Sequence, residues 1–518
     1  MRQAVSPRPV TNSLESRRRE RSAQNFPVVS LQIELSMPLD SWKRESHTKI
    51  VATAGPACDT IEKLEELILA GVDVFRLNTA HGSAAEHQVR LDRIRLAEKR
   101  AGRMVAVLVD LAGPKMRLGE IPGGSIDLLV GEQVAFIRGH VTTDPREFTC
   151  IYEPLLDELT TGNRVMLADG TVALRVLSND GQRALCEVTQ GSTLRSKQGV
   201  NLPYVQLKAA AMSDLDRTNA VWAVEARADY VSLSFVRTAQ DIIDLKVLIL
   251  AQHSANPPHV IAKIEKPEAL ENLEAIVHEA DGIMVARGDL GVEVDIAEIA
   301  VAQKRIVAAC HRARKPVIIA TQMLDSMHNS RIPTRAEATD VANAILDGAD
   351  ACMLSGETAI GKYPCEAVQM MHRIAIATEP LLRDRLYIRN EESRPTPGVS
   401  PITDAAARAA GRLAEELSAK LVVVASSTGR AALSLSKNRR FVPTIGVSDS
   451  LSSLRRMCLY WGVIPVPDAP AHEDRELIDF VTQRGLATGD LQRGDRILVL
   501  SGTGLPTSRH NVVLVHEV

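Results

Sequence analysis

The sequence predicts an α/β fold: a (β/α)8 TIM barrel with an inserted small β-barrel domain and a C-terminal α/β domain. Three observations support this prediction. From Lys49 onward, short apolar runs alternate with helical stretches, and eight such units fill the ~250 residues that a barrel needs. An interruption at residues 114–208 has short β-rich segments separated by glycine turns. A second series of strands and helices follows residue 389.

The first 40 residues are predicted to be a disordered arm. They have no sustained apolar period and include the basic run Arg17–Arg21. A targeting peptide is the alternative, but the acidic residues Glu15, Glu20 and Glu34 are unusual for one.

The barrel is predicted in two parts, residues 41–113 and 209–388. Short apolar runs that end at polar residues indicate buried parallel strands. Helices are expected at 61–70 and near 85–101. The expected strands are 50–53, 72–77, 104–109, 230–235, 260–264, 283–286, 317–320 and 351–354.

The two remaining regions are predicted from their turns and linkers. Residues 114–208 contain the turns Gly123-Gly124, Asp169-Gly170 and Asp180-Gly181, which favour an all-β domain. Residues 389–518 begin with a Pro-containing linker and continue as a mainly parallel open sheet. Its strands are expected at 421–425, 444–447, 462–466, 496–501 and 511–516.

Composition limits the classes of function. The 518 residues carry a net charge of −3, which gives no reason to expect nucleic-acid or membrane binding. No apolar run reaches the ~20 residues of a membrane-spanning helix. The seven cysteines form no CxxC pair, so a reducing compartment is favoured over disulfides or structural zinc.

Polar residues follow most of the expected barrel strands. In a parallel barrel the carboxyl ends of all strands lie at one face, where ligands bind, so an active site is expected there. For the stretch His259–Gly291 taken alone, a surface salt-bridge cluster is an equal alternative. The polar strand ends are Arg76-Leu77-Asn78, Asp110, Lys263 with Glu265, Arg287-Gly288-Asp289, Thr321-Gln322 and Ser355-Gly356-Glu357-Thr358.

These residue types limit the chemistry. Glu265 and Asp289 offer the hard oxygen ligands that suit Mg²⁺ or Mn²⁺. Arg76, Arg117 and Lys263 supply positive charge for phosphate or carboxylate oxygens. The chain has no P-loop, no Ser-His-Asp order and no nucleophilic-cysteine signature. A metal with cations and no nucleophile indicates phosphoryl transfer or enolate chemistry.

From about Thr48 to its C-terminus, the chain resembles the pyruvate kinase family. The resemblance rests on several long strings, and chance agreement over them is negligible. They are TKIVATAGPA from Thr48, the RLN and HG of residues 76–82, SKQGVNLP from Ser196, IAKIE from Ile261, DGIMVARGDLGVE from Asp281, KPVIIATQMLDSM from Lys315 and PTRAEATDVANAILDGADACMLSGETAIGKYP from Pro333.

The resemblance implies transfer of the phosphoryl group of phosphoenolpyruvate to ADP, giving pyruvate and ATP in a site that the inserted domain closes. It implies that Glu265 and Asp289 hold Mg²⁺ (or Mn²⁺), and that Lys263 neutralises the transferred group. The remaining residues that it implies are Arg76 for the phosphate, Gly288, Asp289 and Thr321 for the substrate carboxylate, Thr321 and Ser355 for the proton, and Arg117, Asn78 and Lys197 for the nucleotide.

The chain departs from the family pattern at the monovalent-cation site. Asn78 and Asp110 are kept, but Ala80 and Leu111 replace a serine and a threonine. Lys115 stands where K⁺-dependent members carry a glutamate, and its ammonium can supply the charge that K⁺ brings. We therefore expect that K⁺ is not required. Two other departures, Ala112 and Gln198, replace lysines and leave the nucleotide preference open.

The C-terminal domain carries a hydroxyl-rich turn between an apolar strand and a helix: Ser426, Ser427, Thr428, Gly429 and Arg430. Backbone N–H groups at a helix N-terminus favour a phosphate, and the resemblance implies a phosphorylated effector here. An ordinary βα turn is the alternative, and the identity of the effector stays open. The resemblance also implies a homotetramer and a cytoplasmic location.

Two other functions are compatible with parts of this pattern. A Mg²⁺-dependent carbon–carbon lyase can also use Glu and Asp at strand ends, but the inserted and C-terminal domains argue against it. A catalytically silent effector-binding protein is disfavoured because Lys263, Glu265, Asp289 and Thr321 occur together.

Overall fold

The eight strands predicted for the barrel form a closed parallel ring, which confirms the predicted fold. The computed structural model describes residues 42, 44–205, 210–388, 396–502 and 510–518. All of them belong to the unit Ser36–Val518. The predicted arm, and residues 389–395 of the predicted linker, lie outside the described residues. Around the ring, the strands are β1 (Lys49–Thr53), β16 (Ala351–Leu354), β15 (Val317–Ala320), β14 (Gly282–Ala286), β13 (His259–Ile264), β12 (Tyr230–Leu233), β3 (Ala106–Asp110) and β2 (Val74–Asn78).

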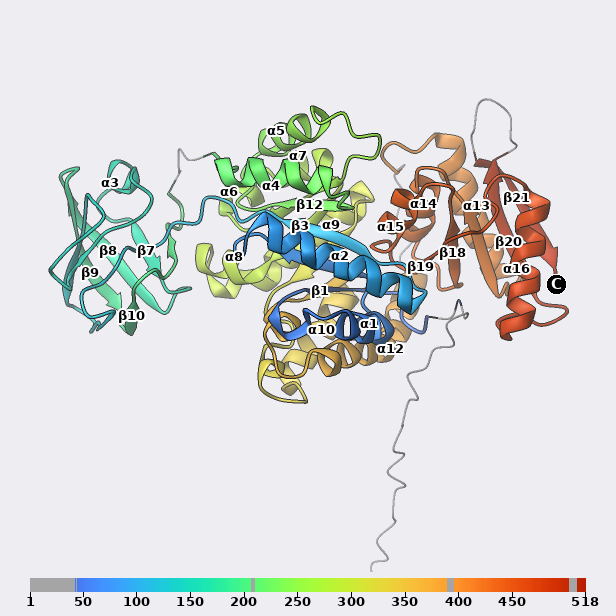
Figure 1. Ribbon diagram of the computed structural model, residues 1–518, viewed down its shortest axis with the longest axis horizontal. Coiled ribbons are helices and arrows are strands. Elements are labelled where there is room, and N and C mark those ends of the chain that lie inside the picture. The colour runs from blue at the N-terminus through green and yellow to red at the C-terminus, as the bar shows by residue number, and fades with distance from the viewer. Residues whose placement is uncertain (1–41, 43, 206–209, 389–395, 503–509) are drawn as a thin grey trace, which may run out of the picture. The chain divides into compact units, whose positions relative to one another are not determined.

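Helices surround this ring (Figure 1). Several begin at a hydroxyl residue whose side chain caps the first turn, such as Ser83 before α2 and Thr334 before α10. The helices are α1 (Ile61–Ala70), α2 (Ala84–Ala101), α4 (Asp214–Glu225), α5 (Ala239–Leu250), α6 (Pro267–Glu271), α7 (Leu273–Glu279), α8 (Arg287–Glu293), α9 (Ile299–Ala313), α10 (Arg335–Asp347), α11 (Gly356–Ala359) and α12 (Pro364–Ile388), with short 3-10 turns η1 (Pro56–Cys58), η2 (Ile296–Glu298) and η3 (Asp325–His328).

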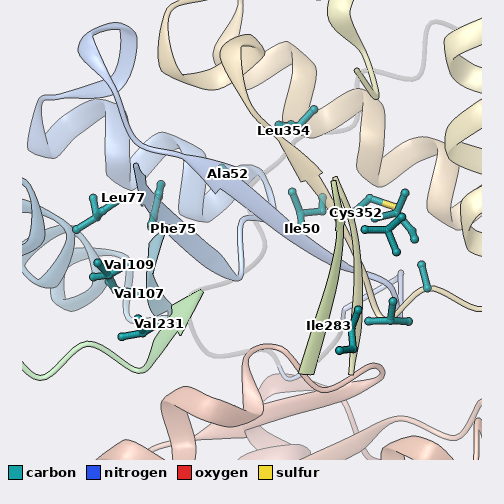
Figure 2. Close-up of a cluster of buried hydrophobic side chains, with 14 of the residues drawn as sticks. Ile50, Ala52, Phe75, Leu77, Val107, Val109, Val231, Ile283, Cys352 and Leu354 are labelled. Carbon is teal, nitrogen blue, oxygen red and sulfur yellow. The ribbon is translucent and has the colours of Figure 1, made fainter. Parts of the chain in front are cut away.

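The ring strands alternate between two apolar layers. Ile50 and Ala52 of β1 pack in the layer between ring and helices, while Val51 packs inside the ring. Figure 2 shows part of the outer layer, including Phe75 and Leu77 of β2. Because side chains alternate along a strand, every second residue of each strand faces the ring interior. The interior is therefore apolar along most of its length, and polar residues enter it only near the strand ends.

Four aspartates mark the amino-terminal face of the ring. Counted along the chain, each aspartate is the residue just before an even-numbered ring strand: the second, fourth, sixth or eighth. Its Oδ2 accepts a 2.8 Å hydrogen bond from a backbone N–H near the start of the ring strand that comes before it in the chain. These side chains continue the ladder where the neighbouring backbone has no partner left. The pairs are Asp73 with Ile50, Asp229 with Val107, Asp281 with Val260 and Asp350 with Val317.

The second and third strands begin two residues later than predicted, at Val74 and Ala106. Val72 is buried like a strand residue, which explains the prediction. The chain pairs with β1 at this point through Asp73, whose carboxylate accepts from Ile50 N and whose N–H donates to Ile50 O at 3.0 Å. The regular ladder starts only after that residue.

The region inserted between β3 and α4 is all-β apart from the short helix α3 (Leu155–Glu158). Its strands share one apolar core that includes Phe136, Leu167, Leu174 and Val188. A six-stranded sheet has the order β11 (Val200–Asn201), β7 (Arg164–Leu167), β8 (Val172–Asn179), β9 (Arg183–Gln190), β5 (Gln133–Ile137) and β6 (Glu147–Phe148), and a two-stranded sheet pairs β10 (Thr193–Arg195) with β4 (Ser125–Asp127).

The C-terminal region is a three-layer α/β sheet. Val422 and Val424 face a core with α13 (Pro401–Glu416) and α14 (Arg430–Lys437), whereas Leu421 and Val423 face α16 (Asp474–Thr488). Helix α15 (Leu451–Met457) joins the first of these cores. The strand order is β19 (Val463–Val466), β18 (Thr444–Val447), β17 (Leu421–Ala425), β20 (Arg496–Gly502) and β21 (His510–Glu517), of which only β21 is antiparallel.

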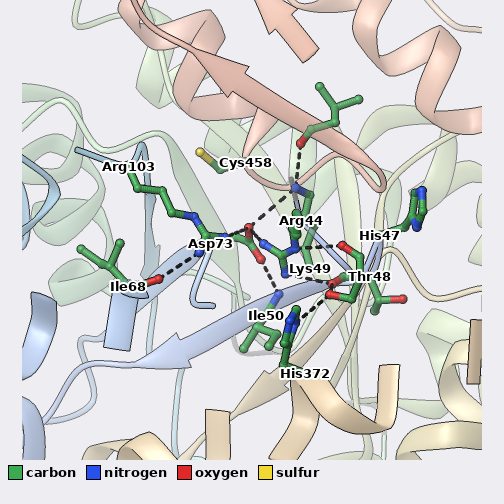
Figure 3. Close-up of polar contacts among 12 residues, drawn as sticks. Arg44, His47, Thr48, Lys49, Ile50, Ile68, Asp73, Arg103, His372 and Cys458 are labelled. Atoms are coloured by element: carbon green, nitrogen blue, oxygen red, sulfur yellow. Dashed lines mark hydrogen bonds and ion pairs between the residues drawn. The ribbon is translucent and has the colours of Figure 1, made fainter. Parts of the chain in front are cut away.

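Ion pairs join the amino-terminal face of the ring to this C-terminal region. Figure 3 shows Asp73 among Arg44, Lys49 and Arg103, with the Lys49 ammonium also donating to Val463 O at 2.7 Å. Burial lowers the pKa of Lys49 to about 8. A second pair joins Asp350 before β16 to Lys437, the last residue of α14, at 2.6 Å. Both side chains of this second pair are almost fully buried.

Among the described residues, no helix is long and apolar enough to cross a membrane.

Candidate active site

Polar side chains gather where the ring strands end. Arg76 lies two residues after the interior residue Val74, Asp110 two after Leu108, and Lys263 two after Ile261. Glu265 follows in the same phase, so all four side chains project toward the axis of the ring. We call Arg76, Asp110, Lys263 and Glu265 the carboxyl-end cluster.

Asp110 connects the members of this cluster. Its Oδ2 accepts two hydrogen bonds from the Arg76 guanidinium, at 2.8 and 2.5 Å. Its Oδ1 accepts from Ser232 Oγ at 2.6 Å and lies 3.5 Å from Lys263 Nζ. Burial alone would raise the pKa of Asp110, but Lys263 and Arg76 lower it to about 2. The carboxylate is therefore ionised at neutral pH and fixes both cations.

Lys263 is a permanently charged ammonium. It donates to Ser234 Oγ at 2.7 Å and lies 2.7 Å from Glu265 Oε1. Burial alone would lower the pKa of Lys263, but the carboxylates of Asp110, Glu265 and Asp289 raise it above its ordinary value. Lys263 can therefore stabilise developing negative charge without taking part in proton transfer.

Glu265 carries the excess negative charge of the site. Its Oε2 accepts from Phe235 N at 2.8 Å, whereas Oε1, although close to Lys263 Nζ, receives no well-directed hydrogen bond. Burial raises the pKa of Glu265, Lys263 lowers it and Asp289 raises it again, with a net rise. The opposing effects on this pKa arise because the Lys263 ammonium and the Asp289 carboxylate both lie near Glu265, while burial removes the water that would stabilise its charged form.

A divalent cation fits this donor set. Glu265 has a buried oxygen without a hydrogen bond, and the Asp289 carboxylate makes no hydrogen bond or ion pair with any described residue. Both offer hard oxygen ligands of the kind that Mg²⁺ and Mn²⁺ prefer. No group of three or more metal-ligating side chains occurs in the described part of the chain. Substrate or water oxygens would therefore have to complete the coordination.

Helix α8 begins beside the cluster and carries Gly288 and Asp289 in its first turn. Gly288 N donates to Thr321 Oγ1 at 2.7 Å, which joins this turn to the end of β15. Thr321 has a φ of +68°, in the left-handed region that disfavours β-branched residues. Arg287 holds it there by donating to Thr321 O at 2.9 Å. The strained backbone thus turns the threonine hydroxyl toward α8.

Ser355, at the end of β16, has a buried hydroxyl with no hydrogen-bond partner in the described part of the protein. Its backbone N–H donates to Glu357 Oε2 at 2.7 Å, and the other oxygen of Glu357 accepts from Leu324 N at 3.1 Å. Glu357 therefore fixes the loops after β15 and β16 relative to each other. The unpartnered hydroxyl is free to bind a substrate or a water molecule.

A cavity of about 370 Å³ lies between the ring and the inserted sheet. Arg117 and Lys197 line it from the inserted region, and Asp289 lines it from the ring. Arg117 donates to Lys197 O at 3.2 Å, while the Lys197 ammonium pairs with exposed Glu120 at 2.7 Å. Lys115 also lines the cavity and is exposed. The volume is that of a small-molecule site, and its cations suit an anionic ligand.

Of the predicted site residues, only Asp289, Lys115, Arg117 and Lys197 line this cavity. Asn78 pairs with Asp110 in the β2–β3 register, and its Oδ1 accepts from Ala80 N at 3.1 Å. Neither Asn78 nor Asp110 lines the cavity with Lys115, so the predicted monovalent-cation residues do not form one cluster there. The segment Ser426–Arg430 belongs to the C-terminal sheet, between β17 and α14.

The turn at residues 426–430 is partly exposed. Gly429 has a φ of +76°, and Ser426 Oγ accepts from Ala431 N at 3.4 Å. Ser427, Thr428 and Arg430 are exposed, and Arg430 donates to Gly398 O at 2.8 Å.

Several residues of the site were not predicted from the sequence. Ser232 in the fourth strand holds Asp110, and Ser234 just after that strand holds Lys263. Thr53 of the first strand accepts from Arg76 at 3.1 Å. Their signal was present, because each hydroxyl interrupts an apolar strand in the phase that faces the ring interior. Lys266 also lines the cavity, but nothing in its local pattern distinguishes it from a surface lysine.

The chain is similar to known proteins over most of its length. Residues 45–368 match the family model "Pyruvate kinase, barrel domain", and residues 404–516 match "Pyruvate kinase, alpha/beta domain". It is 39% identical to a pyruvate kinase of Geobacillus stearothermophilus, over 91% of this chain and 80% of that protein. The corresponding values for a pyruvate kinase of Agrobacterium vitis are 38%, 89% and 94%.

A solved structure is also similar. The crystal structure of a pyruvate kinase from Cryptosporidium parvum superposes with a TM-score of 0.85 at 33% sequence identity. The match covers 91% of this chain and 96% of that one.

Proposed function

The chain belongs to the pyruvate kinase family of phosphotransferases, and on this premise we propose that it transfers the phosphoryl group of phosphoenolpyruvate to ADP, giving pyruvate and ATP. One observation carries the proposal: the Lys263 ammonium lies among three carboxylates, and one of these, Asp289, lines a cavity that several cations also line. Such a site provides charge and position rather than a nucleophile, which is what phosphoryl transfer requires.

Each residue of the carboxyl-end cluster has a proposed task. Arg76 holds the substrate phosphate, because Asp110 and Thr53 orient its guanidinium before the substrate arrives. Lys263 neutralises the phosphoryl group in transfer and the enolate oxygen that forms. The backbone of Gly288 and Asp289, together with Thr321, holds the substrate carboxylate at the start of α8. Thr321 and Ser355 offer hydroxyls from which the enolate carbon takes its proton.

Mg²⁺ or Mn²⁺ is proposed to bind Glu265 and Asp289. When bound, the ion would balance the excess negative charge of the three carboxylates and attract the anionic substrate. Arg117 and Lys197, which line the cavity from the inserted region, are proposed to bind the nucleotide phosphates. Asn78, at the end of β2 and outside the cavity lining, is proposed as a further nucleotide contact. The inserted sheet would exclude water from the cavity during transfer.

The test is a coupled assay with phosphoenolpyruvate, ADP and Mg²⁺. Wild-type protein should form pyruvate, and Lys263→Met should lose at least about 10³-fold in kcat, because it removes the charge nearest the transferred group. Lys304→Met, an exposed lysine on α9, is the matched control and should keep its activity. Absence of pyruvate formation by wild type with either metal present would exclude the proposed activity.

We also propose that K⁺ is not required. The Asp110 carboxylate is already bound by Arg76, Ser232 and Lys263, so it has little capacity left for a monovalent cation. Lys115 adds a positive charge at the cavity, and its ammonium pairs with no carboxylate among the described residues. Activity in Na⁺- or choline-only buffer should equal that in K⁺. A strong activation of wild type by K⁺ would contradict this, and Lys115→Glu should create such an activation.

The remaining parts of the proposal concern regulation and location. The turn of Ser426, Ser427, Thr428, Gly429 and Arg430 is proposed to bind the phosphate of an effector, since the hydroxyl residues Ser427 and Thr428 are exposed just before α14. Calorimetry with sugar phosphates on wild type and Ser427→Ala would test this.

A homotetramer is proposed and would be tested by sedimentation. All seven cysteines are free, which suits the proposed cytoplasmic location.

A further inference from the structure

Glu293 joins the inserted sheet to the barrel at the edge of the cavity. Its Oε1 accepts from Asn201 Nδ2 of strand β11 at 3.0 Å and from Lys266 Nζ at 2.7 Å. Glu293 is only 1% exposed, and its Oε2 receives no hydrogen bond in the described part of the chain. A carboxylate buried to this extent needs a cation, and Lys266 supplies it. Asn201 is not needed to balance the charge of Glu293, so the effect of its hydrogen bond is to connect strand β11 to the barrel.

The three residues lie next to the proposed catalytic groups. Asn201 and Lys266 line the cavity. Glu293 is the last residue of α8, whose first turn carries Asp289. Lys266 directly follows Glu265 in the sequence. The contact between sheet and barrel therefore involves the two elements that present the proposed metal ligands.

Phe235 extends this connection to the point where the chain leaves the ring. Its ring lies under the Lys266 ammonium, 5.9 Å from the centroid, and its backbone N–H holds Glu265. A Cβ at Gly113, just after β3, would overlap the Phe235 ring. One set of contacts thus joins strand β11, the segment after β13 that carries Glu265, and the start of the inserted region.

We propose that Glu293 is a positioning residue that holds the inserted sheet over the cavity through Asn201, with Lys266 as its fixed counter-ion. This inference rests on the proposed function, because it assigns the nucleotide to the cavity. The proposed nucleotide contacts Arg117 and Lys197 are on the inserted region, whereas the proposed phosphoenolpyruvate contacts are on the barrel. A looser sheet must be ordered by the nucleotide when it binds, and that ordering weakens the apparent affinity for ADP.

The first variant is Asn201→Ala, which removes one hydrogen bond to a charged group and leaves the Lys266–Glu293 pair in place. The KM for ADP should rise about tenfold, the usual effect of losing one such bond. The KM for phosphoenolpyruvate, and kcat at saturating ADP, should change less than roughly twofold, because bound nucleotide restores the closed arrangement. Gln190→Ala is the control, since Gln190 Nε2 donates, among the described residues, to Gly170 O and Thr171 O in the turn before β8.

A pair of charge variants separates positioning from simple packing. Aspartate is nearly the same size as asparagine. If Asn201 only filled space, Asn201→Asp should therefore raise the KM for ADP less than Asn201→Ala. The proposed contact predicts the reverse, because two carboxylates would then face each other. Adding Glu293→Gln to Asn201→Asp exchanges the amide and the carboxylate while keeping the net charge beside Lys266. The double variant should recover most of the lost affinity for ADP.

Hydrogen exchange gives a readout that does not depend on activity. Without substrates, the amides of residues 197–202 should exchange faster in Asn201→Ala than in wild type or Gln190→Ala. Equal exchange, an Asn201→Asp variant milder than Asn201→Ala, or a double variant no better than Asn201→Asp would each overturn the inference. A wild type that forms no pyruvate would instead overturn the proposed function, and the exchange result would still decide whether Glu293 positions the sheet.

Discussion

Replacing Asp110 by asparagine should destabilise the barrel by about 2 kcal/mol at pH 7. Arg76 and Lys263 lower the pKa of this buried carboxyl from 3.8 to about 2. Each tenfold change in acidity corresponds to ~1.4 kcal/mol, so the ionised Asp110 contributes about 2 kcal/mol to folding. Asparagine keeps the shape of the side chain but cannot compensate the two cations.

The same shift determines the pH dependence. Because the folded pKa lies below the unfolded one, the contribution is complete above about pH 4 and is lost as the pH falls toward 2. The difference between wild type and Asp110→Asn should therefore be about 1 kcal/mol smaller at pH 3 than at pH 5. Urea unfolding followed by tryptophan fluorescence, to which Trp222 in barrel helix α4 contributes, measures both values.

A matched control separates this effect from a general loss of negative charge. Asp127→Asn removes an exposed carboxylate in β4 and should change stability by less than about 0.5 kcal/mol. If Asp110→Asn were equally mild at pH 7, or if its effect were the same at pH 3 and pH 5, the two cations could not be holding Asp110 ionised. The pairing would then contribute nothing to the stability of the site.

Two further predictions concern the ends of the barrel. Lys437→Met should lower the free energy of unfolding by about 3 kcal/mol, because it breaks the buried pair with Asp350, whereas exposed Lys420→Met should not. Burial lowers the pKa of Lys437 to about 8, so its contribution to stability rises with pH from 8 to 10.5, and the methionine variant should lack that slope. Gly113→Ala combines a φ of +71° with an overlap against the aromatic ring after β12. It should lower stability and kcat/KM more than Gly139→Ala, which also has a positive φ but open space around it.

Local pattern was sufficient for the architecture. Most expected strands of the ring and the C-terminal sheet agree with the structure to within one or two residues, because a buried parallel strand is a short apolar run that ends at polar residues. The pattern also located Lys263 and Glu265, since the side chains that follow an apolar run at a strand end must lie at the carboxyl face of a barrel. The same rule covered Arg76, Asp110 and Thr321.

Pairings between distant residues were decided by the tertiary structure alone. Nothing around Asn201 or Glu293 in the sequence indicates that they meet, because their contact depends on how the inserted sheet lies against α8. The four aspartates at the amino-terminal face have no local signal either. Each is a single acidic residue before a strand, and its task becomes visible only when the neighbouring strand is in register.

The sequence by itself determined the eight-stranded ring, the interrupted chain order and the strand ends that carry the polar residues. Those features depend on the spacing of apolar and polar residues along the chain, which is a local property. Only the tertiary structure decided which cation each carboxylate binds, and that three carboxylates share one ammonium at Lys263. Charge and burial depend on distances in space, so residues far apart in the sequence set the chemistry of the site.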